Sequence, residues 1–279
     1  MEKIRFLHIP KTAGSTFARI LRNQYRGKPR FVFTGDNKID KERFSELSKV
    51  EKDSVGLFTG HAPIVSGIKE ADEIPIITIL RDPVSRVKSF CQYVSEGKSK
   101  YLLGMFPPER FDLDEFLYSG NSELSNLQSR MLINYEMGEK GLLISNLNQD
   151  EIKLMALDNL FNKLTCYGLQ EKFDESLIHI SRKFGWKTPY YEYRNRKDLK
   201  KLLKFEDRHI NKIKELNEID IAFYNEAKER LSAILDLDKE YKKAYEVFRR
   251  RQKIASPMLK LYGDTGRYVK KVFRLVFGK

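Results

Sequence analysis

The sequence predicts an α/β fold, a P-loop-like parallel β-sheet flanked by helices, with a helix-rich C-terminal half. Short β-type runs alternate with helical patterns in the N-terminal third of the chain, and Ile74–Leu80 is a continuous apolar run. Helical patterns then dominate from about residue 112 onward. Strands interleaved with helices are typical of a parallel sheet, and its central strands are apolar throughout because helices cover both faces.

The first predicted strand, Ile4–Ile9, runs into a turn-forming segment of small and hydroxyl residues at 10–16. Apolar side chains at Phe17, Ile20 and Leu21 then recur at helical spacing, which predicts a helix directly after that segment. The remaining predicted strands are Arg30–Thr34, Val55–Thr59, Ile74–Leu80 and Leu164–Gly168.

The apolar run ends at Arg81, and Pro83 predicts the start of a helix because proline is tolerated in the first helical turn. The segment 97–112 contains Pro107 and Pro108, which forbid a regular helix there, so we expect a loop. The buried stripe of the helix that begins at Pro83 is predicted to be Val84, Val87, Phe90 and Cys91.

The length and composition suit one large α/β domain or two small ones. The chain has 279 residues, of which 41% are hydrophobic and 33% charged, and it has no apolar run long enough to span a membrane. The N-terminus lacks the long apolar stretch of a signal peptide. The two cysteines, Cys91 and Cys166, show no CxxC pattern or metal-ligand spacing, so we expect two buried thiols in a reducing, cytoplasmic compartment.

Positive charge is concentrated at the C-terminus. The chain carries a net charge of +13, and residues 242–279 account for +10 of it. We therefore expect a main domain over residues 1–240 and a basic, partly amphipathic tail over residues 241–279. The tail would contact an anionic membrane such as the inner membrane surface, or dock on the body, and both interpretations stay open. Its apolar stripe is Val269, Val272, Phe273 and Val276, opposite Lys270, Lys271 and Arg274.

The segment between the first strand and the first helix suits an anionic group. Gly14 and Ala13 let the backbone come close, and the amide N–H groups at a helix start favour a negative charge. Lys11 adds a mobile positive charge. The segment lacks the GxxxxGK[ST] pattern of a Walker A motif, and an ordinary capped helix start explains these residues equally well. Its hydroxyl donors are Thr12, Ser15 and Thr16.

A second polar segment follows the most apolar strand. Arg81 stands at the carboxyl end of that strand, the edge where ligands bind in open α/β sheets. Ser89 lies eight residues on, about two helical turns away, so both side chains are expected to reach one anion. Asp82 and Arg86 are interpreted as a local cap and a surface ion-pair residue.

These two segments together resemble the nucleotide-binding segments of the PAPS-dependent sulfotransferases. His8–Phe17 is similar to the loop that binds the 5′-phosphosulfate of PAPS (3′-phosphoadenosine 5′-phosphosulfate), and Ile79–Phe90 to the segment that binds its 3′-phosphate. The resemblance is to the carbohydrate branch that contains the heparan sulfate and uronyl 2-O-sulfotransferases. Weaker similarities lie at Gly60–His61, Asn126–Arg130, Tyr167–Phe173 and Ile219–Tyr224.

The resemblance implies transfer of a sulfuryl group from PAPS to a hydroxyl of a carbohydrate acceptor, a polysaccharide or a glycolipid. Lys11 would also stabilise the leaving phosphate, and no metal is expected because a sulfuryl group carries less charge than a phosphoryl group. Arg81 and Ser89 would hold the 3′-phosphate. The residues implied at the 5′-phosphosulfate are Lys11, Thr12, Ala13, Gly14, Ser15 and Thr16.

His61 is implied as the general base, because it follows a predicted strand and matches the position of the family's catalytic histidine. Neutral imidazole is available at physiological pH. The family's double histidine is not reproduced, since Thr59 stands two residues earlier. On the residues alone, a cap at the strand end is the favoured interpretation of His61 over a base. His8 lies inside the first strand and is expected to be structural.

Other polar groups have either a binding or an ordinary interpretation. The polar residues of 126–130 would orient acceptor or nucleotide, or form the polar face of a helix. Glu171 and Lys172 would lie near the adenine, or begin a helix. The loop 97–112 would form a wall of the acceptor cleft, or a solvated loop.

Two other classes of function remain open at this point. A P-loop-like kinase would use ATP, but the Walker lysine–serine pair and an obvious Mg²⁺ carboxylate are missing. A non-enzymatic polyanion-binding protein would use the basic tail. No aromatic-rich RNA motif or zinc finger occurs, so no specific nucleic acid partner is expected.

Overall fold

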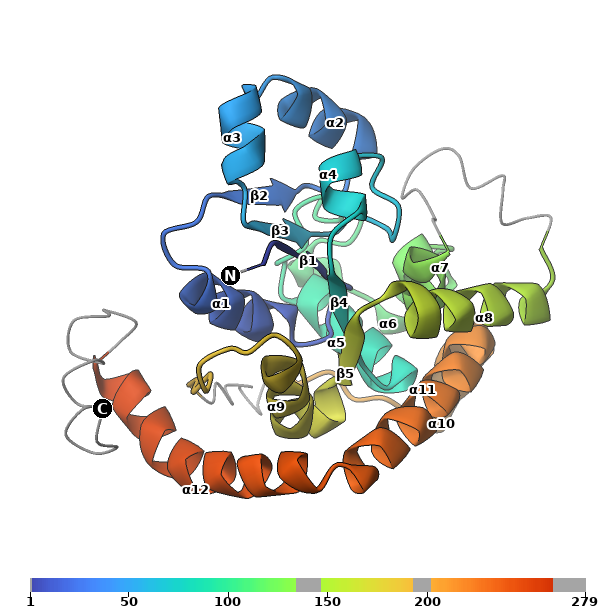
Figure 1. Ribbon diagram of the computed structural model, residues 1–279. Coiled ribbons are helices and arrows are strands. Elements are labelled where there is room, and N and C mark those ends of the chain that lie inside the picture. Colours follow the sequence, from blue (N-terminus) through green and yellow to red (C-terminus); the bar gives the residue numbers. More distant parts are fainter. Residues whose placement is uncertain (1, 134–146, 193–201, 263–279) are drawn as a thin grey trace.

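The computed structural model describes residues 2–133, 147–192 and 202–262. Within these residues, five parallel strands form one sheet in the order β2-β3-β1-β4-β5 (Figure 1). This confirms the predicted fold class, and each predicted strand is present within two residues at either end. The strands are β1 (Ile4–Leu7), β2 (Arg30–Phe33), β3 (Leu57–Gly60), β4 (Ile76–Leu80) and β5 (Cys166–Leu169).

Helices connect and cover these strands (Figure 1). The α-helices are α1 (Gly14–Gln24), α2 (Asn37–Ser45), α3 (Lys49–Ser54), α4 (Lys69–Asp72), α5 (Pro83–Ser95), α6 (Leu113–Tyr118), α7 (Leu127–Leu132), α8 (Gln149–Asp158), α9 (Phe173–Lys183), α10 (Asp207–Leu216), α11 (Glu218–Leu237) and α12 (Lys239–Tyr262). Shorter helical turns are η1 (Pro108–Arg110), η2 (Ser122–Leu124), η3 (Asn159–Lys163) and η4 (Gln170–Lys172).

The inner strands and the edge strand β2 differ in burial, whereas the other edge strand, β5, is buried throughout. β1 and β4 lie at the centre, and every residue of both is buried. β2 lies at an edge, where Phe31 and Phe33 are buried and the alternate residues Arg30 and Val32 are exposed. A continuous apolar run therefore corresponds to a strand covered on both faces, as the sequence predicted for β4.

The register brings the carboxyl ends of the strands to one edge of the sheet. Leu7 of β1 pairs with Gly60 of β3 and with Thr78 of β4, and Leu80 of β4 pairs with Leu169 of β5. The segments that follow these strands therefore emerge side by side. In parallel sheets this edge is where ligand-binding loops gather.

The helix α5 shows the predicted buried stripe with one change. Val87, Phe90 and Cys91 are buried, but Val84 is only partly buried. Arg86 was interpreted as a surface residue, and this is wrong. Its side chain is fully buried and its Nη2 donates to the carbonyl of Glu123 at 2.8 Å.

Both cysteine thiols are free and buried, which confirms that prediction. Burial raises the pKa of Cys91 and of Cys166 to about 12, so both remain neutral thiols at physiological pH.

The last described helix packs on the body. Tyr241 and Phe248 of α12 belong to the main hydrophobic core, and α12 runs along α9 (Figure 1). The chain just after the predicted domain boundary is therefore anchored by apolar contacts. The amphipathic segment 269–276 lies outside the described residues. None of the helices described is long and apolar enough to cross a membrane.

Candidate functional site

The loop between β1 and α1 has an unusual backbone. Lys11 and Ala13 adopt positive φ angles of 70° and 63°, a region that non-glycine residues avoid. Each such residue costs on the order of 1 kcal/mol or more, so the surrounding contacts must maintain the conformation. One of them is the buried Thr12, whose Oγ1 donates to the carbonyl of Ile9 at 2.9 Å.

The helix that follows opens toward the same loop. α1 begins at Gly14, and its N-cap residue Ala13 has no side chain to cap the first N–H groups. The first N–H groups of a helix have no acceptor within the helix, so they are suited to an anionic ligand. The hydroxyls of Ser15 and Thr16 lie in the first turn of α1. Ser15 is exposed and Thr16 is half-buried.

Arg81 reaches this loop from the end of β4. Its Nη1 donates to the carbonyl of Lys11 at 2.9 Å, although the two residues are 70 positions apart. Its Nε is buried and has no hydrogen-bond partner among the described residues. The two segments singled out in the sequence therefore meet, with donor capacity still available on the guanidinium.

The backbone of Arg81 is held by a buried glutamine. Gln128 accepts from the N–H of Arg81 at 2.9 Å and donates to its carbonyl at 2.8 Å. Asp220 in turn accepts from the N–H groups of Gln128 and Ser129 at 3.0 and 2.8 Å. Sequence reasoning identified the polar residues of 126–130 but not this supporting role, because the partner on α11 lies about ninety residues away.

Lys11 lies in a partly buried, positively charged place. Its Nζ stands 3.9 Å from the centre of the Tyr93 ring, a cation–π contact. Burial lowers the pKa of Lys11 to about 8, with further lowering from the charges of Arg81 and Lys98. An anion bound next to Lys11 would favour the charged form of the lysine and would offset the cost of its burial.

His61 faces His8 across the sheet edge. The Nδ1 of His61 lies 2.8 Å from the backbone carbonyl of His8, and the two rings are 4.5 Å apart. A carbonyl oxygen only accepts, so Nδ1 of His61 is the donor in this contact, and in the neutral imidazole the lone pair is then on Nε2. Burial lowers the pKa of His8 to about 3, with smaller contributions from His61 and Lys11, so His8 is neutral.

Glu171, just after β5, links two neighbouring segments at this edge of the sheet. Glu171 accepts from the N–H of Asp82 at 3.0 Å and from the hydroxyl of Tyr224 at 2.8 Å. It thus ties the start of α5 to α11. Lys172 turns away, and its Nζ donates to Ser232 at 2.9 Å. The Asp82 side chain caps α5 by accepting from the N–H of Ser85 at 2.8 Å, as interpreted from the sequence.

Several other sequence candidates lie apart from this edge or make no contact with it. Ser89 is half-buried in the second turn of α5, and in the described parts of the chain it has no hydrogen bond to Arg81. Arg130 donates to the carbonyls of Ser122 and Ser125, each at 2.9 Å. Asn126 accepts from the N–H of Asp220 at 3.0 Å.

The loop 97–112 brings the charge of Lys98 near Lys11, and it is anchored in a hydrophobic cluster with α5 and α6. Leu102 and Phe106 are buried, whereas Tyr101, Leu103 and Met105 are 60%, 45% and 63% exposed. Two surface hollows that the structure shows lie elsewhere. One, of about 320 Å³, is bounded by α6 and α10, and the other by α10 and α11.

Gly14 is required by the packing of this site. A Cβ at this position would lie 1.7 Å from Nε2 of His8, and that ring is already stacked on Phe6 and beside His61. We expect Gly14→Ala to push the His8 ring against His61 and to weaken anion binding. Titration with PAP, the nucleotide that remains when PAPS has lost its sulfuryl group, should show at least tenfold weaker binding. Gly104→Ala, with open space around it, should bind normally. Unchanged binding in Gly14→Ala would contradict the close packing.

No group of three or more His, Cys, Asp or Glu side chains within residues 2–133, 147–192 and 202–262 is arranged to hold a metal ion.

Comparison with solved structures gives a distant similarity. No family model matches the chain, and no curated protein matches it in sequence. The chain is similar to the crystal structure of the mouse sulfotransferase SULT7A1 complexed with PAP, at 14% identity and a TM-score of 0.38. The match covers 77% of this chain, and the chain spans 63% of the mouse one.

Proposed function

We propose that this protein is a PAPS-dependent sulfotransferase that transfers a sulfuryl group to a hydroxyl of a carbohydrate acceptor. The observation that carries the proposal is the contact of Arg81 with the carbonyl of Lys11 at the N-terminus of α1. It joins two anion-binding segments at the carboxyl edge of the sheet. PAPS has an anionic group at each end of its ribose, and the two segments offer one set of donors for each.

The residues present fit such a nucleotide. Half-buried Arg81 has an Nε without a hydrogen-bond partner among the described residues, and α1 starts without a side-chain cap, so donors remain for both anionic ends. Lys11, Thr12, Ala13, Gly14, Ser15 and Thr16 would hold the 5′-phosphosulfate. Arg81 would hold the 3′-phosphate, with Ser89 as a second donor from α5.

PAPS would supply a sulfuryl group joined to a phosphate that leaves as an anion. Lys11 would stabilise the negative charge that develops on the leaving oxygen, which lowers the barrier because this charge is larger in the transition state than in the ground state. The Nε2 lone pair of His61 would accept the proton of the acceptor hydroxyl. The hydrogen bond from Nδ1 to His8 holds the ring in the tautomer needed for this role.

The acceptor is proposed to be a carbohydrate on a polysaccharide or a glycolipid. Support comes from the resemblance of the two segments to the carbohydrate branch of the family, and from the exposed residues of 97–112 beside Lys11. Tyr101 is 60% exposed while its hydroxyl donates to Glu123, so its ring is held in a fixed place. Ordered aromatic surfaces are suited to the apolar faces of sugar rings.

The test of the nucleotide assignment is ligand-induced stabilisation. PAP, the product nucleotide, should raise the melting temperature of the pure protein by several degrees when present at about 100 times its dissociation constant. ATP with Mg²⁺ and NAD should have smaller effects at equal concentration. Greater stabilisation by ATP with Mg²⁺ than by PAP would favour the kinase and contradict the proposal.

A further inference from the structure

The central strand β1 carries a charged side chain in a deeply buried place. Arg5 is fully buried, in register with Phe58 of β3 and Ile76 of β4. Burial lowers the pKa of Arg5 to about 10, and its Nε has no hydrogen-bond partner among the described residues. A buried ion pair is often no more stabilising than apolar residues of the same volume. Stability alone therefore gives no reason for an arginine at this position.

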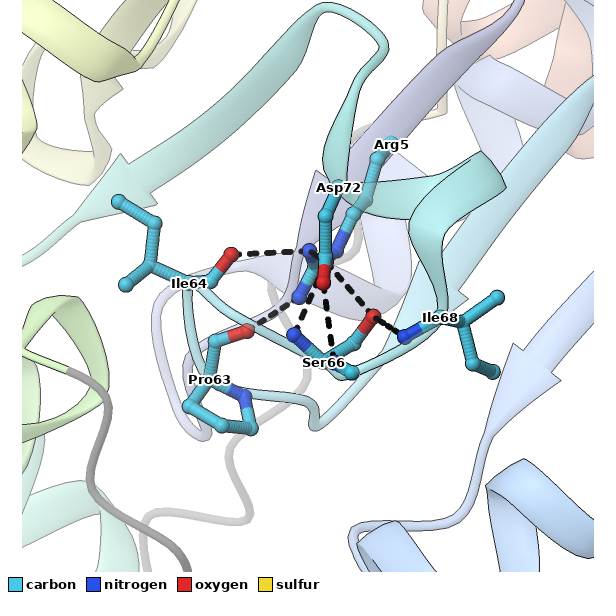
Figure 2. A network of polar contacts seen from close by, with 7 residues as sticks. Arg5, Pro63, Ile64, Ser66, Ile68 and Asp72 are labelled. Carbon is cyan, nitrogen blue, oxygen red and sulfur yellow. Dashed lines mark hydrogen bonds and ion pairs between the residues drawn. The ribbon is translucent and has the colours of Figure 1, made fainter.

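The guanidinium holds the chain just after His61. Nη1 of Arg5 donates to the carbonyl of Ile64 at 3.0 Å, and Nη2 donates to the carbonyl of Pro63. Asp72 of α4 forms the ion pair with Nη1. Figure 2 shows the guanidinium between these two carbonyls and the carboxylate.

Asp72 also accepts hydrogen bonds from the next residues of the same loop. Its Oδ1 accepts from the N–H and the Oγ of Ser66 at 2.9 and 2.7 Å, and its Oδ2 accepts from the N–H of Gly67 at 2.9 Å. Ser66 Oγ also accepts from the N–H of Ile68 at 3.2 Å (Figure 2). We call this network of Arg5 and Asp72 with the backbone of 63–67 the Arg5–Asp72 clamp.

His61 lies between the end of β3 and this clamp. Gly60, which precedes it, has a φ of 133°, and a Cβ there would lie 2.3 Å from the carbonyl oxygen of Phe33. The entry to the loop is therefore a sharp backbone turn that only glycine allows. Pro63, two residues after His61, is the first residue held by the clamp. The backbone of His61 is thus fixed from both sides.

We infer that Arg5 is a positioning residue for His61: the Arg5–Asp72 clamp holds residues 63–67 so that the His61 ring keeps its Nδ1–H on the carbonyl of His8 and presents Nε2 to the acceptor. The part about the acceptor rests on the proposed function, whereas the part about the ring geometry does not. An imidazole displaced by about 1 Å can lose about 100-fold in rate, so the clamp has a functional consequence beyond stability.

The test compares Arg5→Lys and Asp72→Asn with the wild type. Lysine retains the charge but cannot span two carbonyls and a carboxylate, and asparagine removes the ion pair while keeping its shape. We expect kcat to fall about 10- to 100-fold in both variants, with PAP affinity within twofold because loop 10–16 and Arg81 lie outside the clamp. In ¹⁵N spectra of the imidazoles, His61 should change from one Nδ1–H tautomer to a mixture.

Arg43→Lys is the matched control. Arg43 pairs with Asp40 at 2.9 Å and lies over the Phe31 ring, as Arg5 lies over the Phe33 ring, but its side chain is 44% exposed. It should leave kcat and the His61 spectrum unchanged. Melting curves give the folded fraction of every variant, and if Arg5→Lys does not fold, Asp72→Asn provides the same comparison.

Two results would overturn the inference. One is a loss of kcat no larger than the loss of folded protein, and the other is an unchanged His61 tautomer in the folded variants. Failure of the proposed function would look different, because wild-type protein would then neither bind PAP nor transfer sulfuryl. The ¹⁵N comparison would still decide whether the clamp positions His61.

Discussion

Lys11→Met should lower kcat by about 100- to 1,000-fold, the usual loss when one preorganised charge donor to a developing anion is removed. Methionine keeps the side chain as far as Cε and removes the charged Nζ, so the apolar stem remains while the charge and the cation–π contact with Tyr93 are lost. Lys52→Met is the matched control, since Lys52 also lies over an aromatic ring, 5.6 Å from the centre of Phe44, far from the sheet edge. Activity equal to wild type in Lys11→Met would refute the assigned role.

The pH dependence of PAP binding tests the same residue in another way. The pKa of free Lys11 is about 8, and a bound phosphate raises it because the opposite charge favours the ammonium form. Binding between pH 8 and 9 should therefore take up protons, and affinity should fall as the pH rises through 8. Calorimetry in buffers of different ionisation enthalpy measures the proton uptake, which should vanish in Lys11→Met. A pH-independent affinity in the wild type would show that Lys11 does not face the nucleotide.

His61→Asn should lower kcat by about 100- to 10,000-fold, the range for loss of a general base. The asparagine amide can still donate to the carbonyl of His8, so the loop anchor at 2.8 Å is preserved while the Nε2 lone pair is lost. PAP affinity should stay within twofold. His179→Asn on α9 is the control, because that histidine is half-buried on a helix far along the chain from this loop. If His61→Asn transferred sulfuryl at the wild-type rate, another group would have to be the base.

His8 shows how much the tertiary structure adds to a local interpretation. The sequence places His8 in a strand and predicts a structural role for it. The residues next to His61 in the sequence include no second histidine, since Thr59 stands two residues earlier. In the fold, parallel pairing of β1 with β3 brings His8 to within 4.5 Å of the His61 ring, from 53 residues away. The pairing of rings is set by strand register, which no local pattern records.

The sequence alone determined the fold class, because a continuous apolar strand and alternating strands and helices have one stable arrangement in water, a parallel sheet covered on both faces. It also predicted the loop 10–16 and Arg81 as anion-binding candidates, since small residues before a helix and an arginine after a buried strand carry their chemistry locally. Only the tertiary structure decided that Gln128 holds Arg81, that Arg86 is buried, and that Arg5 grips the loop of His61. These roles depend on contacts between residues 37 to 59 positions apart. Such contacts form only when the secondary-structure elements pack together, so no local sequence pattern indicates them.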